Sequence, residues 1–409
     1  MSRQRRRTPT TSTHTGTGDS ARRPRVLIIA GAYLPGSKAG GPIQSLAAIA
    51  HHLGTEIDLF IACWDRDFGD SAPYPDIPIA EWTVTGHARV LYLHPSDFKL
   101  KRYRTLLAEI RPDILYLNEL YSIRQSVLPA TLTRFIRYPP RVIVAPRGCL
   151  NPEALKIKRM KKLAYLRTLR AIGLARQIEW HATSNLEASA IRKHMGPVSV
   201  VHAPDISIPS PHPLAPPLSK YKSKMRLLFL ARISPMKNLP YLLNRIANVR
   251  GEISLTIAGP LEDIQHWNLC KTLIARLPKT VQVVNTGLVS REQASALFAA
   301  HHFFVLPTLG ESYCHSIVES LDSGCPVLIS DRTPWSRIPD MSAGWVMPLE
   351  DEHAWEKQLQ VCCDMDDNDY QPLRSHAKAA HNALIEMDNI KNAYRAMFSL
   401  PHSDSRHIR

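Results

Sequence analysis

The sequence predicts an α/β protein of two doubly wound, Rossmann-like domains whose parallel sheets face a central cleft. Short runs of apolar and β-branched residues alternate with helical patterns, and this alternation occurs twice along the chain. The length of 409 residues also suits two domains better than one hydrophobic core. Strands that alternate with helices form a parallel sheet covered on both faces, with ligand sites at the carboxyl ends of the strands.

The first domain is predicted over residues 25–202 and the second over residues 223–371. Six prolines between residues 203 and 219 exclude a continuous helix or a central strand, so we assign residues 203–222 to a linker. A helical segment follows over 372–400. The first domain has a helix over 42–53, and the predicted strands of the two domains are 26–30, 57–63, 88–93, 114–117 and 142–145, then 227–231, 255–258, 281–285, 303–306 and 327–330.

The formal charge of +15 is concentrated in two segments. Seven arginines lie within residues 1–25 without the apolar stretch of a secretory signal, so we expect residues 1–24 to form a disordered basic tail, with an organellar transit peptide as the alternative. Eight Lys or Arg and no acid lie between Glu153 and Glu179. Phosphates, nucleic acid and an acidic membrane surface all suit such a charge.

Cysteine usage and hydropathy indicate a cytoplasmic protein. No apolar run reaches the about 18 residues of a membrane span. The seven cysteines include no C-x-x-C pair, which argues against a disulfide framework or a zinc ribbon. We interpret them as reduced thiols.

The most informative segment surrounds Glu311 and Glu319. A predicted strand ends at Leu306, Glu311 lies in the loop that follows, and a helix is expected to begin near Tyr313 with Glu319 on its second turn. A helix N-terminus offers N–H groups to an anion, and the two carboxylates can each bind a pair of hydroxyl groups. A ligand with a diphosphate and two diols meets both needs. In the alternative interpretation, Glu311 only caps a helix and Glu319 is solvated.

Further candidates lie in three loops. Arg232 and Lys237 follow the first strand of the second domain, where two cations can neutralise a departing diphosphate. The alternative is that they only form a solvated turn. Gly40 and Gly41 precede a helix and could let the backbone approach a phosphate or an acceptor. The alternative is that they only form a flexible turn. Arg147 is a candidate phosphate or acceptor contact, with a structural ion pair as the alternative.

The segment from Glu311 to Glu319 resembles the E-x7-E motif of glycosyltransferase family 4, the "glycosyl transferases group 1" type of the GT-B fold. This resemblance implies a retaining enzyme in which Glu311 holds hydroxyls of the donor sugar and Glu319 holds the ribose. Backbone amides of Tyr313, Cys314 and His315 would meet the donor.

Two other segments resemble the same family. Arg232 and Lys237 match its G-R-x4-K-G pattern, with Ala231 and Asn238 in place of the glycines. Many members have the segment D-V-x-H-x-H-E. The corresponding residues here are 113–119, in which Asn118 takes the place of the second histidine. An asparagine cannot titrate, so Asn118 is expected to position the sugar while the leaving phosphate takes the acceptor proton.

The resemblance implies a UDP-sugar or GDP-sugar donor, no metal or other cofactor, and a glycan or polyprenyl-linked acceptor in surface polysaccharide synthesis. It also implies that segment 372–400 packs back across the domain junction. Asp65 and Asp67 read as the D-x-D metal motif of another glycosyltransferase fold, but we expect no metal there. The basic stretch 155–176 is interpreted as one amphipathic helix that either rests on anionic lipid at the inner face of the plasma membrane or packs on its own domain.

Two other functions remain open. A sugar-nucleotide epimerase or phosphorylase would have the same fold. A non-catalytic protein would bind a nucleotide sugar or nucleic acid, although no aromatic RNP pair or zinc finger supports nucleic acid, which we do not expect as a partner.

Overall fold

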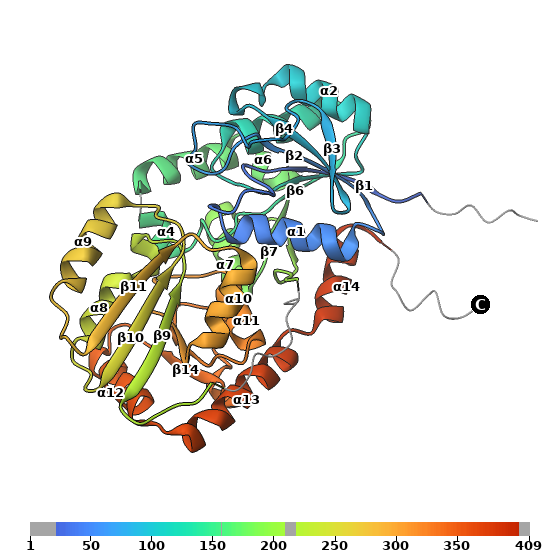
Figure 1. The fold of residues 1–409 in the computed structure, drawn as a ribbon. Coiled ribbons are helices and arrows are strands. Elements are labelled where there is room, and N and C mark those ends of the chain that lie inside the picture. The colour runs from blue at the N-terminus through green and yellow to red at the C-terminus, as the bar shows by residue number, and fades with distance from the viewer. Residues whose placement is uncertain (1–21, 157, 209–217, 401–409) are drawn as a thin grey trace, which may run out of the picture.

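The computed structural model describes residues 22–156, 158–208 and 218–400. In this part of the chain, strands form two sheets, one in each of two domains (Figure 1). The N-terminal sheet has the order β3-β4-β2-β1-β5-β6-β7-β8, and the C-terminal sheet has the order β11-β10-β9-β12-β13-β14. Neighbouring strands are parallel except for β3 and β4. The predicted fold of two doubly wound α/β domains is therefore confirmed.

Five of the N-terminal strands coincide with predicted ones to within two residues. The strands β3, β7 and β8 escaped prediction: β3 is a partly exposed antiparallel edge, and β7 contains Glu179 and His181. The strands are β1 (Arg25–Ile29), β2 (Asp58–Trp64), β3 (Trp82–Thr85), β4 (Ala88–Leu93), β5 (Ile114–Leu117), β6 (Arg141–Val144), β7 (Glu179–Ala182) and β8 (Val200–His202).

The helices of the N-terminal domain correct one prediction, because the basic stretch 155–176 is not a single helix. The chain breaks around Lys158 and again at Gly173, which both adopt left-handed backbone conformations with φ of 55° and 71°. Leu155, Leu166 and Leu169 are buried in the core of their own domain. The helices are α1 (Gly41–Leu53), α2 (Leu100–Ile110), α3 (Leu128–Leu132), α4 (Pro152–Lys156), α5 (Arg159–Ala171), α6 (Leu174–Gln177) and α7 (Asn185–Met195), with helical turns at Pro95–Asp97, Ile123–Val127 and Thr133–Phe135.

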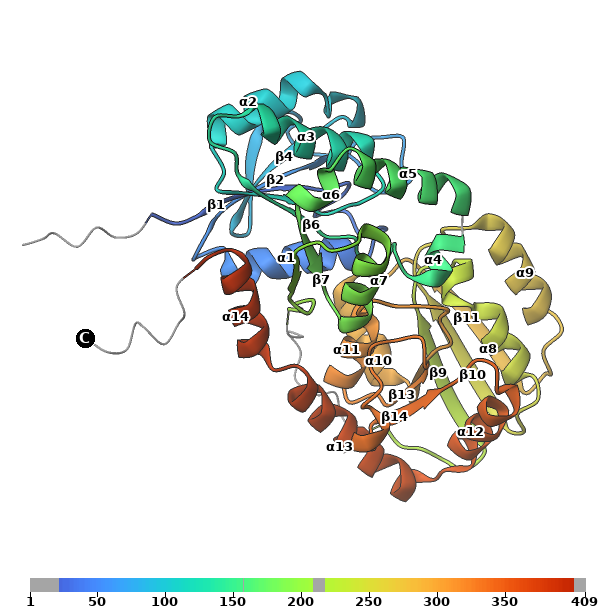
Figure 2. The same cartoon turned by 180° about the vertical axis from the view of Figure 1, so that it is seen from behind.

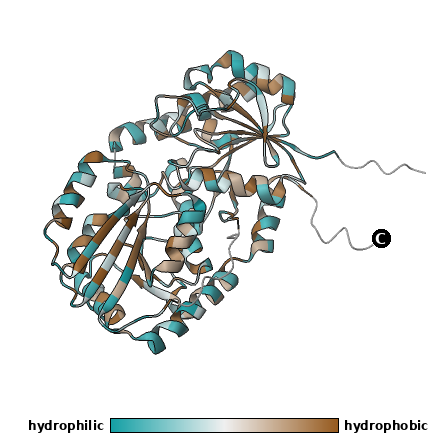
Figure 3. Ribbon diagram, viewed as in Figure 1, coloured by the Kyte–Doolittle hydropathy of each residue, from teal (hydrophilic) through white to brown (hydrophobic). Residues whose placement is uncertain are grey.

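The C-terminal domain contains the five predicted strands and a sixth edge strand, β14. Its central strands β12 and β13 are entirely buried, and the strands of both sheets stand out as hydrophobic in Figure 3. The strands are β9 (Lys224–Leu230), β10 (Glu252–Ala258), β11 (Val281–Gly287), β12 (Phe303–Leu306), β13 (Val327–Ser330) and β14 (Gly344–Met347). The helices are α8 (Leu239–Ile246), α9 (Ile264–Ile274), α10 (Arg291–Ala300), α11 (His315–Asp322), α12 (Glu352–Asp364) and α13 (Asp367–Leu384), with turns at Pro235–Lys237 and Pro339–Met341.

The last helix, α14 (Met387–Met397), returns to the N-terminal domain and lies beside α1 in both ribbon views (Figures 1 and 2). Arg395 of α14 forms an ion pair with Glu56, with 2.7 Å between Nη2 and Oε1. Arg141 of β6 donates a hydrogen bond of 3.1 Å to the Met397 carbonyl. The preceding helix α13 begins at Asp367, so the predicted boundary at residue 372 falls inside it.

Parts of the described linker are packed, although Ser219, Tyr221 and Lys222 are exposed. Ala203, Asp205 and Ile206 are buried, and so is Lys220, whose ammonium donates to three backbone carbonyls around the end of α12. Most of the predicted proline-rich stretch, 209–217, lies outside the described residues, as do residues 1–21 of the predicted tail. None of the described helices is both long and apolar enough to span a bilayer.

Candidate active site

The two domains meet where the carboxyl end of the N-terminal sheet faces the loop between β12 and α11. His315, the first residue of α11, lies with its Nε2 atom 3.1 Å from the Ser45 hydroxyl of α1. On the other side of the loop, Asn151 donates to the Ser312 hydroxyl at 3.4 Å. Gly148 (φ 78°) lies against Ser312, and a Cβ atom at residue 148 would be 2.5 Å from the Ser312 hydroxyl. This close approach of the domains requires glycine.

Glu311 and Lys237, both predicted site residues, are brought together by the C-terminal sheet. The Lys237 ammonium lies 2.5 Å from Oε1 of Glu311, and both side chains are almost completely buried, at 13% and 11% exposure. The Thr308 hydroxyl donates to the same carboxylate oxygen at 2.8 Å. Leu309 donates its N–H to the Met236 carbonyl, which fixes the two loops relative to each other. The pair thus has a defined place at the carboxyl ends of β9 and β12.

Arg232 lies in the same loop as Lys237 but contacts a different residue. Its guanidinium is 2.9 Å from the Glu262 carboxylate, and both side chains are about a third exposed. Asn238, which stands where the family pattern has a glycine, adopts a left-handed conformation with φ of 57°. Asparagine tolerates this region better than most residues do, so the departure from the pattern preserves the turn.

Glu319 lies on the second turn of α11 and lines a pocket. Burial raises the pKa of its carboxyl group to about 7, and the positive charge of Arg291 opposes this rise. The pocket lies between the linker and three helices, and its lining residues are Ser207, Ile208, Arg291, Ser295, Val318, Glu319, Asp322, Ser323 and His381.

The N-terminus of α11 separates the two glutamates. Cys314 caps the helix with a left-handed backbone conformation (φ 74°), and the first N–H groups of α11 have no partner within the helix. Burial raises the pKa of the Cys314 thiol to about 12. The negative charges of Glu311 and Glu319 add to this rise, and the positive charge of Lys237 opposes it. Tyr313 is buried and packs on Trp335, with 5.3 Å between ring centroids, so its backbone rather than its ring is available to a ligand.

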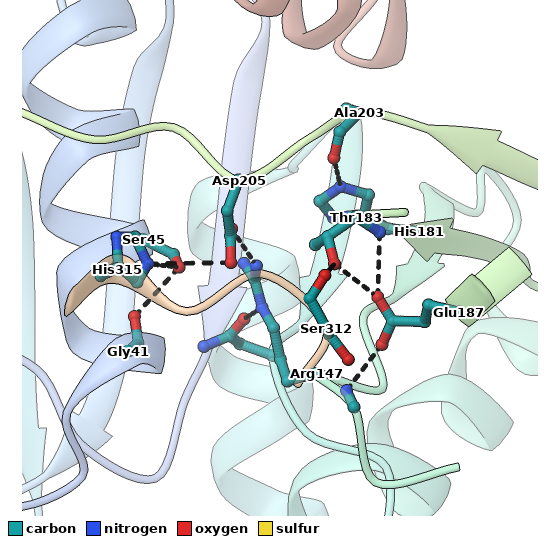
Figure 4. A network of polar contacts seen from close by, with 12 residues as sticks. Gly41, Ser45, Arg147, His181, Thr183, Glu187, Ala203, Asp205, Ser312 and His315 are labelled. Carbon is teal, nitrogen blue, oxygen red and sulfur yellow. Dashed lines mark hydrogen bonds and ion pairs between the residues drawn. The ribbon is translucent and has the colours of Figure 1, made fainter. Parts of the chain in front are cut away.

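Arg147 forms part of a buried polar network that spans the domain junction (Figure 4). The Arg147 guanidinium forms an ion pair with Asp205 and donates to the Asn118 side-chain oxygen at 2.8 Å. Asp205 also lies 3.8 Å from Nε2 of His315. Burial favours a higher pKa for Asp205, but the charge of Arg147, together with His315, His181 and a hydrogen bond from Ser45, lowers the pKa below its usual value. Asp205 was not singled out from the sequence, because one aspartate in a proline-rich linker gives no signal.

The glycine pair of the N-terminal domain also lies at the junction. Gly40 has a φ of 65° and open space around the position of a side chain, whereas a Cβ atom at Gly41 would contact the His315 ring at 3.4 Å. The Asp67 carboxylate accepts hydrogen bonds from the N–H groups of Ser37 and Lys38 at 2.7 and 3.0 Å. Asp67 therefore fixes the loop that leads to the glycines.

Asp65, the other acid of the D-x-D triplet, forms an ion pair with Arg66. In residues 22–156, 158–208 and 218–400, no group of three or more His, Cys, Asp or Glu side chains is placed to hold a metal ion.

Comparison with known proteins adds a family match and a set of related structures. Residues 224–364 match the family model described as "Glycosyl transferases group 1". No curated protein sequence matches significantly. Sucrose-phosphate synthase (tll1590) from Thermosynechococcus elongatus is similar in structure, with a TM-score of 0.69, 14% identity, and coverage of 92% of this chain and 100% of that one.

Two other structures show the same likeness. Anabaena Alr3699/HepE in complex with UDP and glucose has a TM-score of 0.67 at 15% identity, over 92% of this chain and 99% of that one. WaaG, a glycosyltransferase involved in lipopolysaccharide biosynthesis, has a TM-score of 0.64 at 14% identity, over 91% and 99%. The C-terminal domain thus matches the glycosyltransferase group 1 model, and the chain has the GT-B fold of these structures.

Proposed function

We propose that the chain is a retaining glycosyltransferase of family 4 that moves a sugar from a UDP-sugar or GDP-sugar to a glycan or polyprenyl-linked acceptor in surface polysaccharide synthesis. The observation that carries this proposal is the position of Glu311 and Glu319 on either side of the α11 N-terminus. The N-terminus suits a diphosphate, Glu311 suits hydroxyls of the donor sugar, and Glu319 suits the ribose. The HepE structure, which holds UDP and glucose, has the same fold.

In the proposed reaction, the bond between the sugar C1 and the diphosphate oxygen breaks while C1 bonds to the acceptor oxygen on the same face. The acceptor hydroxyl proton passes to the departing phosphate. Lys237 and the α11 N–H groups stabilise the negative charge that develops on the diphosphate, and Arg232 adds to them when it leaves Glu262. These cations supply the positive charge, so the proposal includes no metal.

Asn118 has a positioning role in this scheme. Its side-chain oxygen accepts a hydrogen bond from Arg147, so its amide NH₂ group is oriented by a buried ion pair. An oriented NH₂ group can donate to a sugar hydroxyl without taking part in proton transfer.

A thermal-shift screen of UDP-sugars and GDP-sugars tests the donor site. We expect one class to raise the melting temperature of the parent and to have a much smaller effect on Glu319→Ala. Glu81→Ala is the matched control, since Glu81 is an exposed residue outside the site. If no nucleotide sugar stabilises the parent, or if Glu319→Ala responds as the parent does, the donor site is misassigned. Product analysis with the stabilising sugar then separates transfer from epimerisation and phosphorolysis.

The proposal includes peripheral contact of this cytoplasmic protein with an anionic membrane, where polyprenyl-linked acceptors are found. The cations of helices α4 to α6 that point to solvent support it, together with Met160, which is 78% exposed beside them. Such cations attract anionic headgroups by about 1 kcal/mol each near a membrane surface. The exposed cations are Lys156, Lys158, Arg159, Lys161, Arg167, Arg170 and Arg176.

Flotation with vesicles tests this contact. The parent should float with phosphatidylglycerol vesicles and not with phosphatidylcholine vesicles, and Lys161→Glu with Arg167→Glu should abolish flotation. Equal flotation of the parent and the double variant would remove the membrane from the proposal, without bearing on the donor site.

A further inference from the structure

Three residues at the carboxyl ends of β1 and β5 enclose a small space that the proposed donor site does not use. Gly31 follows β1, Glu119 follows β5, and Gln125 lies in the helical turn after Glu119. A Cβ atom built on Gly31 would lie 3.7 Å from Oε1 of Gln125 and 3.7 Å from Oε2 of Glu119, with no other atoms nearer. The two oxygens therefore converge on one point above Gly31.

Gln125 presents an acceptor oxygen without a donor. The side chain is 2% exposed, and its NH₂ group donates to the Ala30 carbonyl at 2.9 Å, which fixes the orientation of the amide. Its Oε1 atom has no hydrogen-bond partner in the described part of the chain. A buried carbonyl oxygen without a partner costs about 1–3 kcal/mol, so a donor from outside the described chain would stabilise this arrangement.

Glu119 is a second acceptor without a donor. No hydrogen bond or ion pair joins its carboxylate to another described residue, and burial raises its pKa. Two tyrosine hydroxyls whose pKa it influences donate elsewhere: Tyr103 to the Arg124 carbonyl at 2.8 Å and Tyr165 to the Leu120 carbonyl at 2.5 Å. These two hydroxyls therefore do not donate to the carboxylate.

We infer that Glu119 and Gln125 bind hydroxyl groups of the acceptor saccharide above Gly31. The inference rests on the proposed function and extends it to the second substrate. Both side-chain oxygens accept hydrogen bonds, so their partner must be a donor, and a sugar hydroxyl is a donor of the right size for a space that a methyl group would fill. Glu119 is adjacent to Asn118, on the sheet edge that meets α11, so an acceptor held there faces the donor sugar.

Saccharide binding without a nucleotide tests the site directly. The probes are the methyl α-glycosides of glucose, galactose and mannose, whose binding to the parent is measured by saturation-transfer NMR and titration. At least one should bind, and Glu119→Gln should weaken its binding by about tenfold, since an amide NH₂ group replaces one acceptor oxygen. Glu109→Gln, on the exposed face of α2, should bind as the parent does.

Gly31→Ala is the sharper variant, because its methyl group fills the space without a clash. A contact of 3.7 Å is an ordinary van der Waals distance, and Gly31 does not require a left-handed conformation. The variant should fold as the parent does and lose glycoside binding. If it does not fold, Glu119→Gln still decides the question.

Binding of UDP separates this inference from the proposed function. Both variants should bind UDP as the parent does, since Gly31 and Glu119 lie outside the donor pocket. Absence of glycoside binding to the parent, or binding unchanged in both variants, would overturn the acceptor site. If the parent itself does not bind UDP or another nucleotide, the proposed function is overturned instead.

Discussion

His315 and Ser45 join the N-termini of two helices from different domains, with 3.1 Å between the imidazole Nε2 and the hydroxyl oxygen. The same histidine lies 3.8 Å from the Asp205 carboxylate, which belongs to the linker. A ligand anion at the α11 N-terminus would therefore lie beside a contact that sets the spacing of the domains.

Asp205→Asn should destabilise the protein strongly. The variant leaves the Arg147 guanidinium, which is 8% exposed, buried without its counter-charge. Removal of one partner from a buried ion pair costs about 3–5 kcal/mol. Urea unfolding measures this loss.

Glu252→Gln is the matched control for the buried pair. It removes one partner of the Lys224–Glu252 pair, whose side chains are 58% and 69% exposed. Exposed pairs contribute about 0–1 kcal/mol, so the control should unfold close to the parent. Equal effects of the two substitutions would contradict a structural role for Asp205.

Stability should fall as the pH drops from about 6.5 to about 4, in part because of His181. Burial lowers its pKa to about 4, and its two ring nitrogens lie 2.7 Å from the Tyr116 hydroxyl and 2.7 Å from the Ala203 carbonyl, as a neutral imidazole requires. The unfolded chain, with a histidine pKa near 6.5, binds more protons in this window, so stability is complete above it and is lost on acidification. The loss approaches about 3 kcal/mol per histidine.

Unfolding free energies measured at intervals from pH 7 to 4.5 check this prediction. His181→Gln keeps a donor and an acceptor but cannot take up a proton, so its stability should depend less steeply on pH than that of the parent. Parallel pH profiles would show that another group causes the slope.

Binding of UDP should strengthen as the pH rises through about 7. Burial raises the pKa of Glu319 to about 7, so below this pH the carboxyl group is largely protonated and accepts hydrogen bonds from ribose hydroxyls less well. Deprotonation should improve affinity by up to about tenfold, the worth of one charged hydrogen bond.

The same shift has the opposite effect on stability. A carboxyl group with a raised folded pKa favours the folded state at low pH, and this contribution is lost as the pH rises from about 4.5 to about 7. Calorimetric titration of UDP into the parent and into Glu319→Gln, at pH 6, 7 and 8, isolates the binding effect, since titration of the UDP phosphate is common to both. A constant ratio of the two affinities would rule out Glu319 as the titrating group.

Glu262→Gln should tighten UDP binding modestly. The substitution removes the carboxylate 2.9 Å from the Arg232 guanidinium and leaves this cation to the diphosphate. A partly exposed pair of this kind is worth about 1 kcal/mol or less, so the gain in affinity is limited to about fivefold. If Arg232→Ala binds UDP as tightly as the parent, Arg232 has no part in donor binding and this prediction fails with it.

The predictable features of the fold are local in sequence. The strand 303–306 and the loop and helix after it follow from an apolar run and its flanking residues, and the structure places Glu311 and Glu319 at the two ends of this unit. By contrast, β7 could not be predicted, because its polar residues are accommodated by partners that are distant in sequence. Glu179 forms an ion pair with Arg141, and His181 is hydrogen-bonded to Tyr116 and Ala203.

The site likewise combines residues that a local sequence pattern identifies with contacts between residues that are distant in sequence. The residues Lys237 and Glu311 could be named from the sequence, but not their contact, since their loops are 74 residues apart. Similarly, the partner of Arg147 is 58 residues away. The break at Lys158 has no local signal, because residues 153–157 contain no glycine or proline and a lysine rarely adopts the left-handed conformation.

The return of α14 to the N-terminal domain means that the chain crosses between domains twice, once in the linker and once between α13 and α14. Rotation of one domain against the other therefore has to bend the chain at both crossings, while the Arg395–Glu56 pair holds α14 on the N-terminal domain.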